Sequence, residues 1–195
     1  KEYNELDFDY SYFVYGLVRQ LKPQNVLEIG LGPHGYTGAS VLQALEENSH
    51  QPYVWYNYKQ KAPTKGKYTC IKIDPAPKAV ERLERFSPNY LNLIVGDSSD
   101  HSLYQDISPQ SIDIALIDGD HSEESMYGDT KIVIEANLLE PREGLLVLHD
   151  TAMVEHTRRA VDRLKKDFNL EVFEVSSSYD DQEKGQSFSI ARPRR

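Results

Sequence analysis

Acids, glycines and histidines recur at the ends of apolar runs, where a folded chain would bring them together. In the stretch 25–35, Asn-Val-Leu-Glu-Ile-Gly-Leu-Gly-Pro-His-Gly, Glu28 precedes Gly30, Gly32 and Gly35. Glycines that follow a strand let the backbone approach a ligand where side chains would block it. A carboxylate here would repel a pyrophosphate, which favours exposed amides and a helix N-terminus. The pattern therefore favours a ligand that carries positive charge and no phosphate.

A second carboxylate, Asp74, follows the apolar run 69–73 and precedes Pro75. One carboxylate offers two acceptor oxygens, enough for both hydroxyls of a ribose that lies across the edge of a sheet. The structural alternative is a cap for the helix that starts near residue 76, and the two roles are compatible. We interpret Asp74 as a candidate ribose ligand.

Two further acids, Asp118 and Asp150, follow the apolar runs 112–117 and 145–148. Neighbouring strands lie about 4.8 Å apart, so both carboxylates should reach the same space. Such a pair is costly unless a proton or a cation separates the charges, and Mg²⁺ accepts one or two carboxylates. Asp118 and Asp150 are therefore predicted metal ligands. The alternative is that Asp118 contacts an organic cofactor while Asp150 caps the next helix.

Histidines stand beside both acids. A neutral hydroxyl that attacks an electrophile loses its proton, and an imidazole with a pKa near 6.5 is suited to accept it. His121 follows Asp118 in a loop, and we predict it to be the general base. His149 directly precedes Asp150, so strand alternation predicts that it points away from that acid and packs structurally. His34, in the glycine loop, is a candidate for the wall of a pocket.

A scaffold of alternating strands and helices positions these residues. Apolar runs separated by helical patterns predict a mostly parallel sheet with helices on both faces. The last two runs, 170–175 and 187–191, are joined by a polar segment and predict a β-hairpin. The other predicted strands are 26–29, 69–73, 91–95, 112–117 and 145–148, and the predicted helices are 10–21, 37–47, 78–86, a short one near 102, 122–139 and 153–168. We expect one doubly wound, Rossmann-like α/β domain over residues 1–195, with seven strands.

The stretch 48–67 interrupts the alternation of predicted strands and helices. It carries Tyr53, Trp55, Tyr56 and Tyr58, and it is longer than the usual connection of about 2 to 6 residues. Such an aromatic insertion could cover a substrate, pack against a second subunit of a homo-oligomer, or add a hairpin at the sheet edge. The sequence leaves these three interpretations open.

Taken in order, these features resemble the class I S-adenosylmethionine-dependent methyltransferases. Glu28-Ile-Gly-Leu-Gly resembles their first signature, although Pro33-His34 places the third glycine one position late. Asp-Gly-Asp-His from residue 118 and His-Asp from residue 149 resemble a subgroup of small O-methyltransferases. The resemblance spans residues 25–150, and the family layout also ends in an antiparallel hairpin.

The resemblance implies a cofactor, an acceptor and site residues. The cofactor is S-adenosylmethionine, with Mg²⁺ in some members, and the acceptor is a small hydroxylated molecule such as a sugar, natural product or phenol. Catechol-type members bind Mg²⁺ with acids at these two strand ends, but they follow the second with Asn or Asp, where this chain has Thr151. Members place an acid after the third strand to receive the adenine amino group. The implied cofactor-binding residues are Glu28, Gly30, Gly32, Gly35, Asp74, Asp97, Ser98 and Asp118.

Two other classes of function compete with this interpretation. A nicotinamide-dependent oxidoreductase uses a similar sheet, but Glu28, the late third glycine and the terminal hairpin disfavour it. A non-catalytic binding protein that keeps the fold is disfavoured because Glu28, Asp74, Asp97 and Asp118 all occur in order.

The amino-acid composition limits which binding partners and which cellular compartment we expect. The 31 acidic and 22 basic residues give a net charge of -9, which disfavours nucleic acid as a partner. The single cysteine, Cys70, excludes an internal disulfide and is interpreted as a buried strand residue in a reducing compartment, so we expect the cytoplasm. No apolar run approaches the roughly 18 residues that span a bilayer, so no membrane partner is expected.

Overall fold

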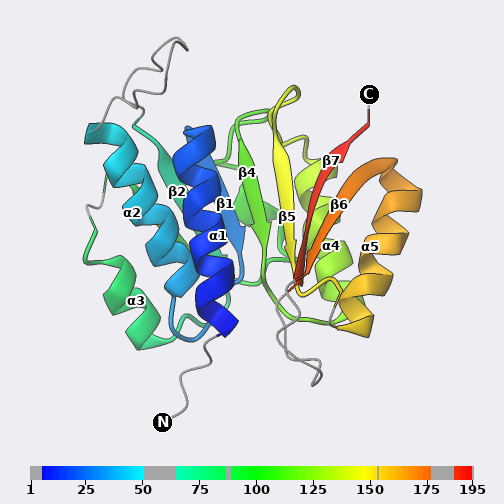
Figure 1. Ribbon diagram of the computed structural model, residues 1–195, viewed down its shortest axis with the longest axis horizontal. Helices are drawn as coiled ribbons and strands as arrows, with labels where there is room; N and C mark the ends of the chain where they lie inside the picture. The colour runs from blue at the N-terminus through cyan, green and yellow to red at the C-terminus, as the bar shows by residue number, and fades with distance from the viewer. Residues whose placement is uncertain (1–5, 51–64, 87–88, 153, 177–186, 195) are drawn as a thin grey trace.

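The computed structural model describes residues 6–50, 65–86, 89–152, 154–176 and 187–194 (Figure 1). Helices and strands alternate along most of this chain. The helices are α1 (Leu6–Leu21), α2 (Tyr36–His50), α3 (Pro77–Leu83), the 3-10 helix η1 (His101–Tyr104), α4 (Glu123–Glu135) and α5 (Glu155–Phe168). The strands are β1 (Asn25–Ile29), β2 (Lys67–Lys72), β3 (Leu91–Val95), β4 (Ile114–Ile117), β5 (Leu145–His149), β6 (Leu170–Ser176) and β7 (Ser187–Pro193).

The seven strands form one sheet in the order β3-β2-β1-β4-β5-β7-β6. The first five strands of the chain are parallel, and β7 lies antiparallel to both β5 and β6. The predicted doubly wound sheet with a C-terminal hairpin is therefore confirmed. The order reverses at β1 and β4, which is where open α/β sheets bind ligands beyond the carboxyl ends of their strands.

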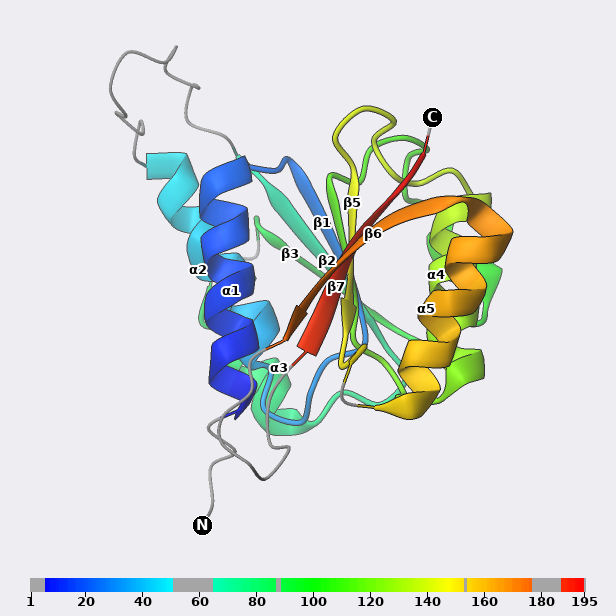
Figure 2. The same ribbon diagram turned by 45° about the vertical axis from the view of Figure 1, so that its right-hand side comes forward.

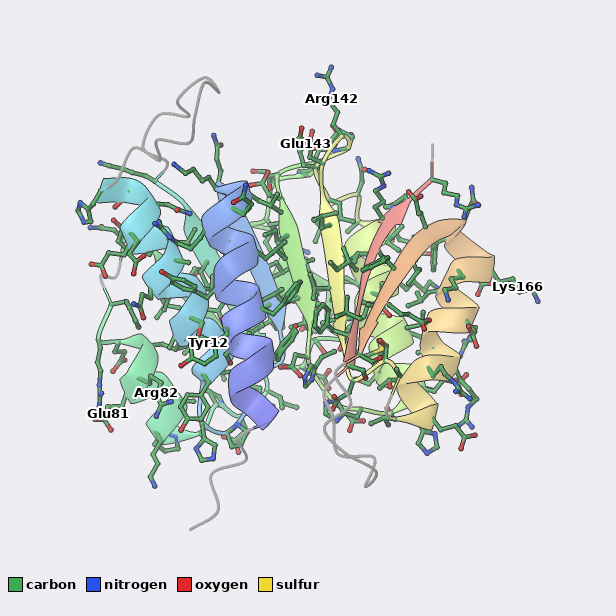
Figure 3. All side chains as sticks on the ribbon, viewed as in Figure 1. Tyr12, Glu81, Arg82, Arg142, Glu143 and Lys166 are labelled. Carbon is green, nitrogen blue, oxygen red and sulfur yellow. The ribbon has the colours of Figure 1, made fainter. Side chains whose placement is uncertain are left out.

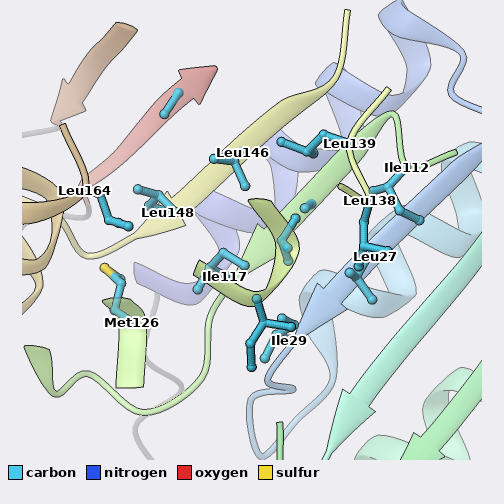
Figure 4. Close-up of a cluster of buried hydrophobic side chains, with 14 of the residues drawn as sticks. Leu27, Ile29, Ile112, Ile117, Met126, Leu138, Leu139, Leu146, Leu148 and Leu164 are labelled. Carbon is cyan, nitrogen blue, oxygen red and sulfur yellow. The ribbon is translucent and has the colours of Figure 1, made fainter. Parts of the chain in front are cut away.

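Helices cover both faces of the sheet, with α1, α2 and α3 on one side and α4 and α5 on the other (Figure 2). Alternation along β1 sends Val26 and Glu28 toward the α1 side, and Leu27 and Ile29 toward the α4 side. The apolar core on the α4 side includes Leu27, Ile29, Ile117, Met126, Leu146 and Leu164 (Figure 4). The other core joins Val14 and Val18 of α1 to Val26, Val41, Leu83 and Leu116.

The region after α4 differs from the prediction. The helix ends at Glu135 rather than continuing to residue 139, because Asn137 takes a left-handed backbone conformation with φ 52°. Leu139 then forms a parallel bridge with Ile112, two residues before β4 begins. The sequence pattern continues the helix to Leu139, but the left-handed residue turns the chain out of the helix. Leu139 therefore packs beside the sheet.

The parallel strands begin at one edge of the sheet, the amino edge, and end at the opposite one, the carboxyl edge. The helix α2 starts at the carboxyl edge and ends at His50, and β2 begins from the amino edge at Lys67. Of the predicted 48–67 insertion, Asn48 is a buried helical residue that donates from Nδ2 to the Val18 carbonyl, 2.9 Å away. Residues 51–64, with the aromatic residues that motivated a substrate or subunit role, lie outside the described residues.

At the amino edge, the turn before β5 presents Arg142 and Glu143 outward (Figure 3). Within the described ranges, no helix has both the length and the apolar character needed to cross a membrane.

Candidate active site

A cavity of about 350 Å³ opens at the carboxyl edge of the sheet, where β1, β2, β4 and β5 end. Its size lies in the range of small-molecule sites. Side chains from α1, the β1–α2 loop and the ends of three more strands converge on it. The lining residues are Tyr10, Leu31, Gly32, Pro33, His34, Gly35, Tyr36, Thr37, Lys72, Asp74, Ala76, Asp118, Gly119, His121 and His149.

The glycine loop passes directly beside the end of β4. Gly30 has φ 95°, and a Cβ at this position would lie 2.0 Å from the Asp118 carbonyl oxygen. Pro33 and His34 occupy a turn in which the Gly35 amide donates to the Gly32 carbonyl at 3.0 Å. Gly35 itself has φ 62°, a conformation that favours glycine. This hydrogen-bonded turn thus accommodates the late position of the third glycine, and its four residues, 32–35, line the cavity.

Glu28 lies behind the cavity wall rather than in it. Its side chain is fully buried, and Oε2 accepts a hydrogen bond from the Tyr68 hydroxyl. Burial, and then the charge of Asp118, raise the pKa of Glu28 to about 8, so this carboxyl is mostly protonated at neutral pH. The residue predicted to attract a cationic ligand therefore supplies little charge, and Asp118 takes its place on the lining.

The remaining cofactor candidates separate into two groups. Asp74 lines the cavity beyond the end of β2, as its predicted role requires. Asp97 and Ser98 are not on the lining, and Asp97 Oδ1 accepts from the Ser99 amide and hydroxyl at 2.9 and 2.8 Å. The backbone hydrogen bond from Ser99 lowers the pKa of Asp97. Its observed contacts are those of a turn.

Asp118, His121, His149 and Asp150 form a compact cluster against the cavity. His149 Nδ1 lies 2.8 Å from Asp118 Oδ1, and His149 Nε2 lies 3.6 Å from Asp150 Oδ1. His121 Nε2 is 3.7 Å from Asp118 Oδ1, and His121 Nδ1 is 3.6 Å from Asp150 Oδ2. The two acids expected to share one space do so, with an imidazole on either side.

The position of His149 corrects the sequence prediction. It was expected to point away from Asp150, yet it lines the cavity and contacts both acids. Asp150 has φ 54° and donates its amide to the Ser187 carbonyl, so strand geometry ends at His149. This left-handed residue turns the Asp150 carboxylate back toward the imidazole, which strand alternation alone does not anticipate.

The electrostatics of the cluster keep Asp118 ionised. Burial raises the pKa of Asp118, but the charge of His149 and the contacts with both imidazoles outweigh it, so the net change is a lowered pKa. The neighbouring Asp118 carboxylate raises the pKa of His121, against an opposing effect of burial. The arrangement thus holds at least one negative charge at the cavity wall.

Several lining residues were not predicted, among them Tyr10, Tyr36, Thr37 and Lys72. Tyr10 is buried in α1, and its ring lies 4.3 Å from that of His149 between centroids. Tyr36 and Thr37 begin the helix after the glycine loop, a position that motif spacing does signal. Tyr10 carries no such signal, because only the packing of α1 across the sheet brings it to the site.

The family is shown by comparison of the sequence with family models. The model of a methyltransferase domain matches residues 27–151, from the middle of β1 to the residue after Asp150. This range covers more than half of the chain and the whole cluster. The chain belongs to this family of methyltransferase domains. Comparison with curated protein sequences gives no match.

Solved structures share the fold at low sequence identity. The O-methyltransferase TomG from Streptomyces achromogenes, in complex with SAM, aligns with a TM-score of 0.70 and 15% identity over 95% of this chain and 79% of that one. An O-methyltransferase from Bacillus cereus, in complex with SAH, gives 0.68 and 13% over 95% and 81%. The N-methyltransferase NodS from Bradyrhizobium japonicum gives 0.63 and 14% over 98% of each chain.

Proposed function

We propose that the protein transfers a methyl group from S-adenosylmethionine to a hydroxyl oxygen of a small molecule such as a sugar, natural product or phenol. The observation that carries this proposal is the junction at Asp118. Asp118 borders the glycine-loop cavity and also belongs to the His–Asp cluster, as do His121 and His149. A cofactor site and a group of acid–base side chains therefore share a wall.

The cavity suits the proposed cofactor. Gly32 and Gly35 line the side nearest the β1–α2 turn, and Asp74 stands at the end of β2, where it would accept the ribose hydroxyls. S-adenosylmethionine carries an ammonium and a sulfonium, and the ionised Asp118 supplies the negative charge that complements them. TomG and the Bacillus cereus enzyme were solved with SAM and SAH, which supports the same cofactor here.

Methyl transfer to a hydroxyl requires removal of one proton. A sulfonium is an activated donor, so the protein contributes position and a proton acceptor. His121 is our candidate for the base, since its half-exposed ring stands at the cavity lining beside two carboxylates. His149 is a second imidazole within the same cluster, held against Asp118.

The same cluster suits a divalent cation, for which Asp118 and Asp150 would be the carboxylate ligands. A bound cation would lower the pKa of a hydroxyl that coordinates it, and Mg²⁺ is the ion that the family resemblance suggests. His121 and His149 surround the two acids, so imidazoles stand where an oxygen-only site would place further carboxylates or amides.

Cofactor binding is the first test. S-adenosylhomocysteine at 100 times its Kd should stabilise the protein by about 2.7 kcal/mol in thermal denaturation, and NADH should have no effect. Asp74→Ala should weaken S-adenosylhomocysteine binding. Asp106→Ala is the matched control, because Asp106 is exposed in a groove beside Asn25 and Lys67 at the amino edge. Stabilisation by NADH alone would instead support an oxidoreductase.

Acceptor chemistry is the second test. Incubation with methyl-labelled S-adenosylmethionine and a panel of phenols, sugars and amines should give labelled O-methyl products, identified by mass spectrometry. NodS is an N-methyltransferase of similar fold, so the amines test a real alternative. Labelled N-methyl products without O-methyl products would contradict oxygen as the acceptor atom.

A further inference from the structure

Three side chains of the His–Asp cluster, Asp118, His121 and His149, are spaced like ligands of one ion. His149 Nδ1 and His121 Nε2 lie 2.8 and 3.7 Å from the same oxygen, Asp118 Oδ1. The 3.6 Å contacts of Asp150 are to the other nitrogen of each ring. Ligand atoms that are each about 2.1 Å from a common metal lie about 3 to 3.5 Å from one another. One donor atom each from Asp118, His121 and His149 already lies within 4.8 Å of the other two.

The donor types point away from magnesium. Mg²⁺ prefers an octahedron of oxygen ligands and usually keeps several waters. Imidazole nitrogen suits Zn²⁺, Fe²⁺, Co²⁺ and neighbouring ions, and two histidines with one carboxylate form a known arrangement for such metals. Asp118, His121 and His149 supply that set, and Asp150 adds a second carboxylate. Two carboxylates with two neutral imidazoles carry a charge that a divalent ion cancels.

One side of the cluster is covered by a side chain, and the other side faces the cavity. The side chains of His149, Asp118 and Asp150 are 9, 13 and 20% exposed, whereas that of His121 is 42% exposed. His121 therefore covers the cluster from solvent, and the cavity lined by His121, His149 and Asp118 gives access from the other side. The cavity is therefore the route by which a cation would reach these side chains.

We propose that Asp118, His121 and His149, with the Asp150 carboxylate beside them, bind a divalent transition-metal ion through both imidazoles, so that His121 is a metal ligand rather than a free base when the ion is present. The inference rests on the cation site of the proposed function. It differs from that proposal in the ligands, because a Mg²⁺ site at Asp118 and Asp150 needs neither imidazole. Metal binding also requires neither S-adenosylmethionine nor an acceptor, so it is measured independently of methyl transfer.

The test uses Co²⁺ as a spectroscopic probe. Untagged full-length protein, stripped with a chelator, is titrated with Co²⁺ while visible absorption is recorded, and bound metal is counted after equilibrium dialysis. We expect one Co²⁺ per chain, with two paramagnetically shifted imidazole N–H signals in the ¹H NMR spectrum. Excess Mg²⁺ should leave both readings unchanged. Absence of stoichiometric Co²⁺, or Co²⁺ bound without shifted imidazole signals, would overturn the inference.

Variants assign the ligands. His121→Ala should weaken Co²⁺ binding by about 100-fold or more and change the absorption spectrum. His50→Ala is the matched control, since His50 is exposed at the far end of α2 from the cavity. Retained S-adenosylhomocysteine binding by His121→Ala would show that the variant is folded. Equal Co²⁺ affinity and spectra in His121→Ala and wild type would contradict a ligand role for His121.

The two proposals fail in different ways. Co²⁺ bound by both imidazoles with no S-adenosylhomocysteine binding would reject the methyltransferase function while supporting the metal site. Methyl transfer that persists in chelator-stripped protein without imidazole-bound Co²⁺ would support the function and reject the metal inference.

Discussion

The two edges of the sheet use carboxylates differently. At the amino edge, Asp113 Oδ2 accepts the backbone amides of Gln24 and Asn25 at 2.7 and 2.9 Å, and Glu140 Oε2 accepts that of Arg142 at 2.8 Å. These carboxylates use their oxygens to tie loops to strand ends, which stabilises the fold.

At the carboxyl edge, Asp118 and Asp150 have imidazoles as neighbours, and Asp118 lines a cavity. Their oxygens lie among titratable and metal-binding groups rather than among backbone amides. The partner of a strand-end carboxylate, more than its presence, therefore separates a structural acid from a candidate site. Substitutions at the two edges should differ accordingly.

Removal of an imidazole at the carboxyl edge should have the largest effect on activity. His121→Ala should reduce turnover by about 10² to 10⁴, because the acceptor proton loses its base or the metal loses a ligand. S-adenosylhomocysteine affinity should change little. Steady-state kinetics together with calorimetry would measure both quantities, and near-normal turnover would remove His121 from the site.

A methyl group on the glycine loop should disrupt the junction between β1 and β4. Gly30→Ala places a Cβ against the Asp118 carbonyl at a φ of 95°, so we expect a loss of about 2 to 5 kcal/mol in unfolding free energy. Gly32→Ala is the control, because its Cβ would meet nothing within 4 Å. Chemical denaturation of both variants checks the contrast, and equal stability would refute the close approach.

The buried acid behind the site should make stability depend on pH. The pKa of Glu28 is about 8 in the folded protein and about 4.5 when unfolded, so the folded state retains a proton that the unfolded state loses. This residue therefore lowers the unfolding free energy as pH rises from about 4.5 to 8, by about 1.4 kcal/mol per unit. Glu28→Gln should remove the effect and be relatively more stable at pH 8 than at pH 5. A difference between variant and wild type that stays constant across this range would contradict it.

Loss of a structural carboxylate at the amino edge should have the smallest effect. Asp113→Ala removes the acceptor for two backbone amides, and we expect about 1 to 2 kcal/mol of destabilisation with unchanged turnover. Thermal denaturation and activity at a temperature well below the transition test this. A large drop in turnover would show that the two edges are not functionally distinct.

Most of the fold was predictable from the sequence, because each strand and helix carries a local signal. Alternating apolar runs and helical patterns specified the five parallel strands and the terminal hairpin. The predicted end of α4 at residue 139 was wrong, because Asn137 takes a left-handed conformation that ends the helix earlier. Motif spacing also placed Asp74 and Asp118 at strand ends and His121 in the loop that follows, and all three line the cavity.

Local sequence patterns were enough to place acids and glycines at the carboxyl ends of strands, and parallel topology brings those ends to one edge. The direction in which each side chain points depends on tertiary packing. The tertiary structure buried Glu28 beside Tyr68, brought Tyr10 across the sheet and turned Asp150 toward His149 through one left-handed residue. These outcomes depend on packing between distant segments and on single backbone torsions, which local patterns do not encode.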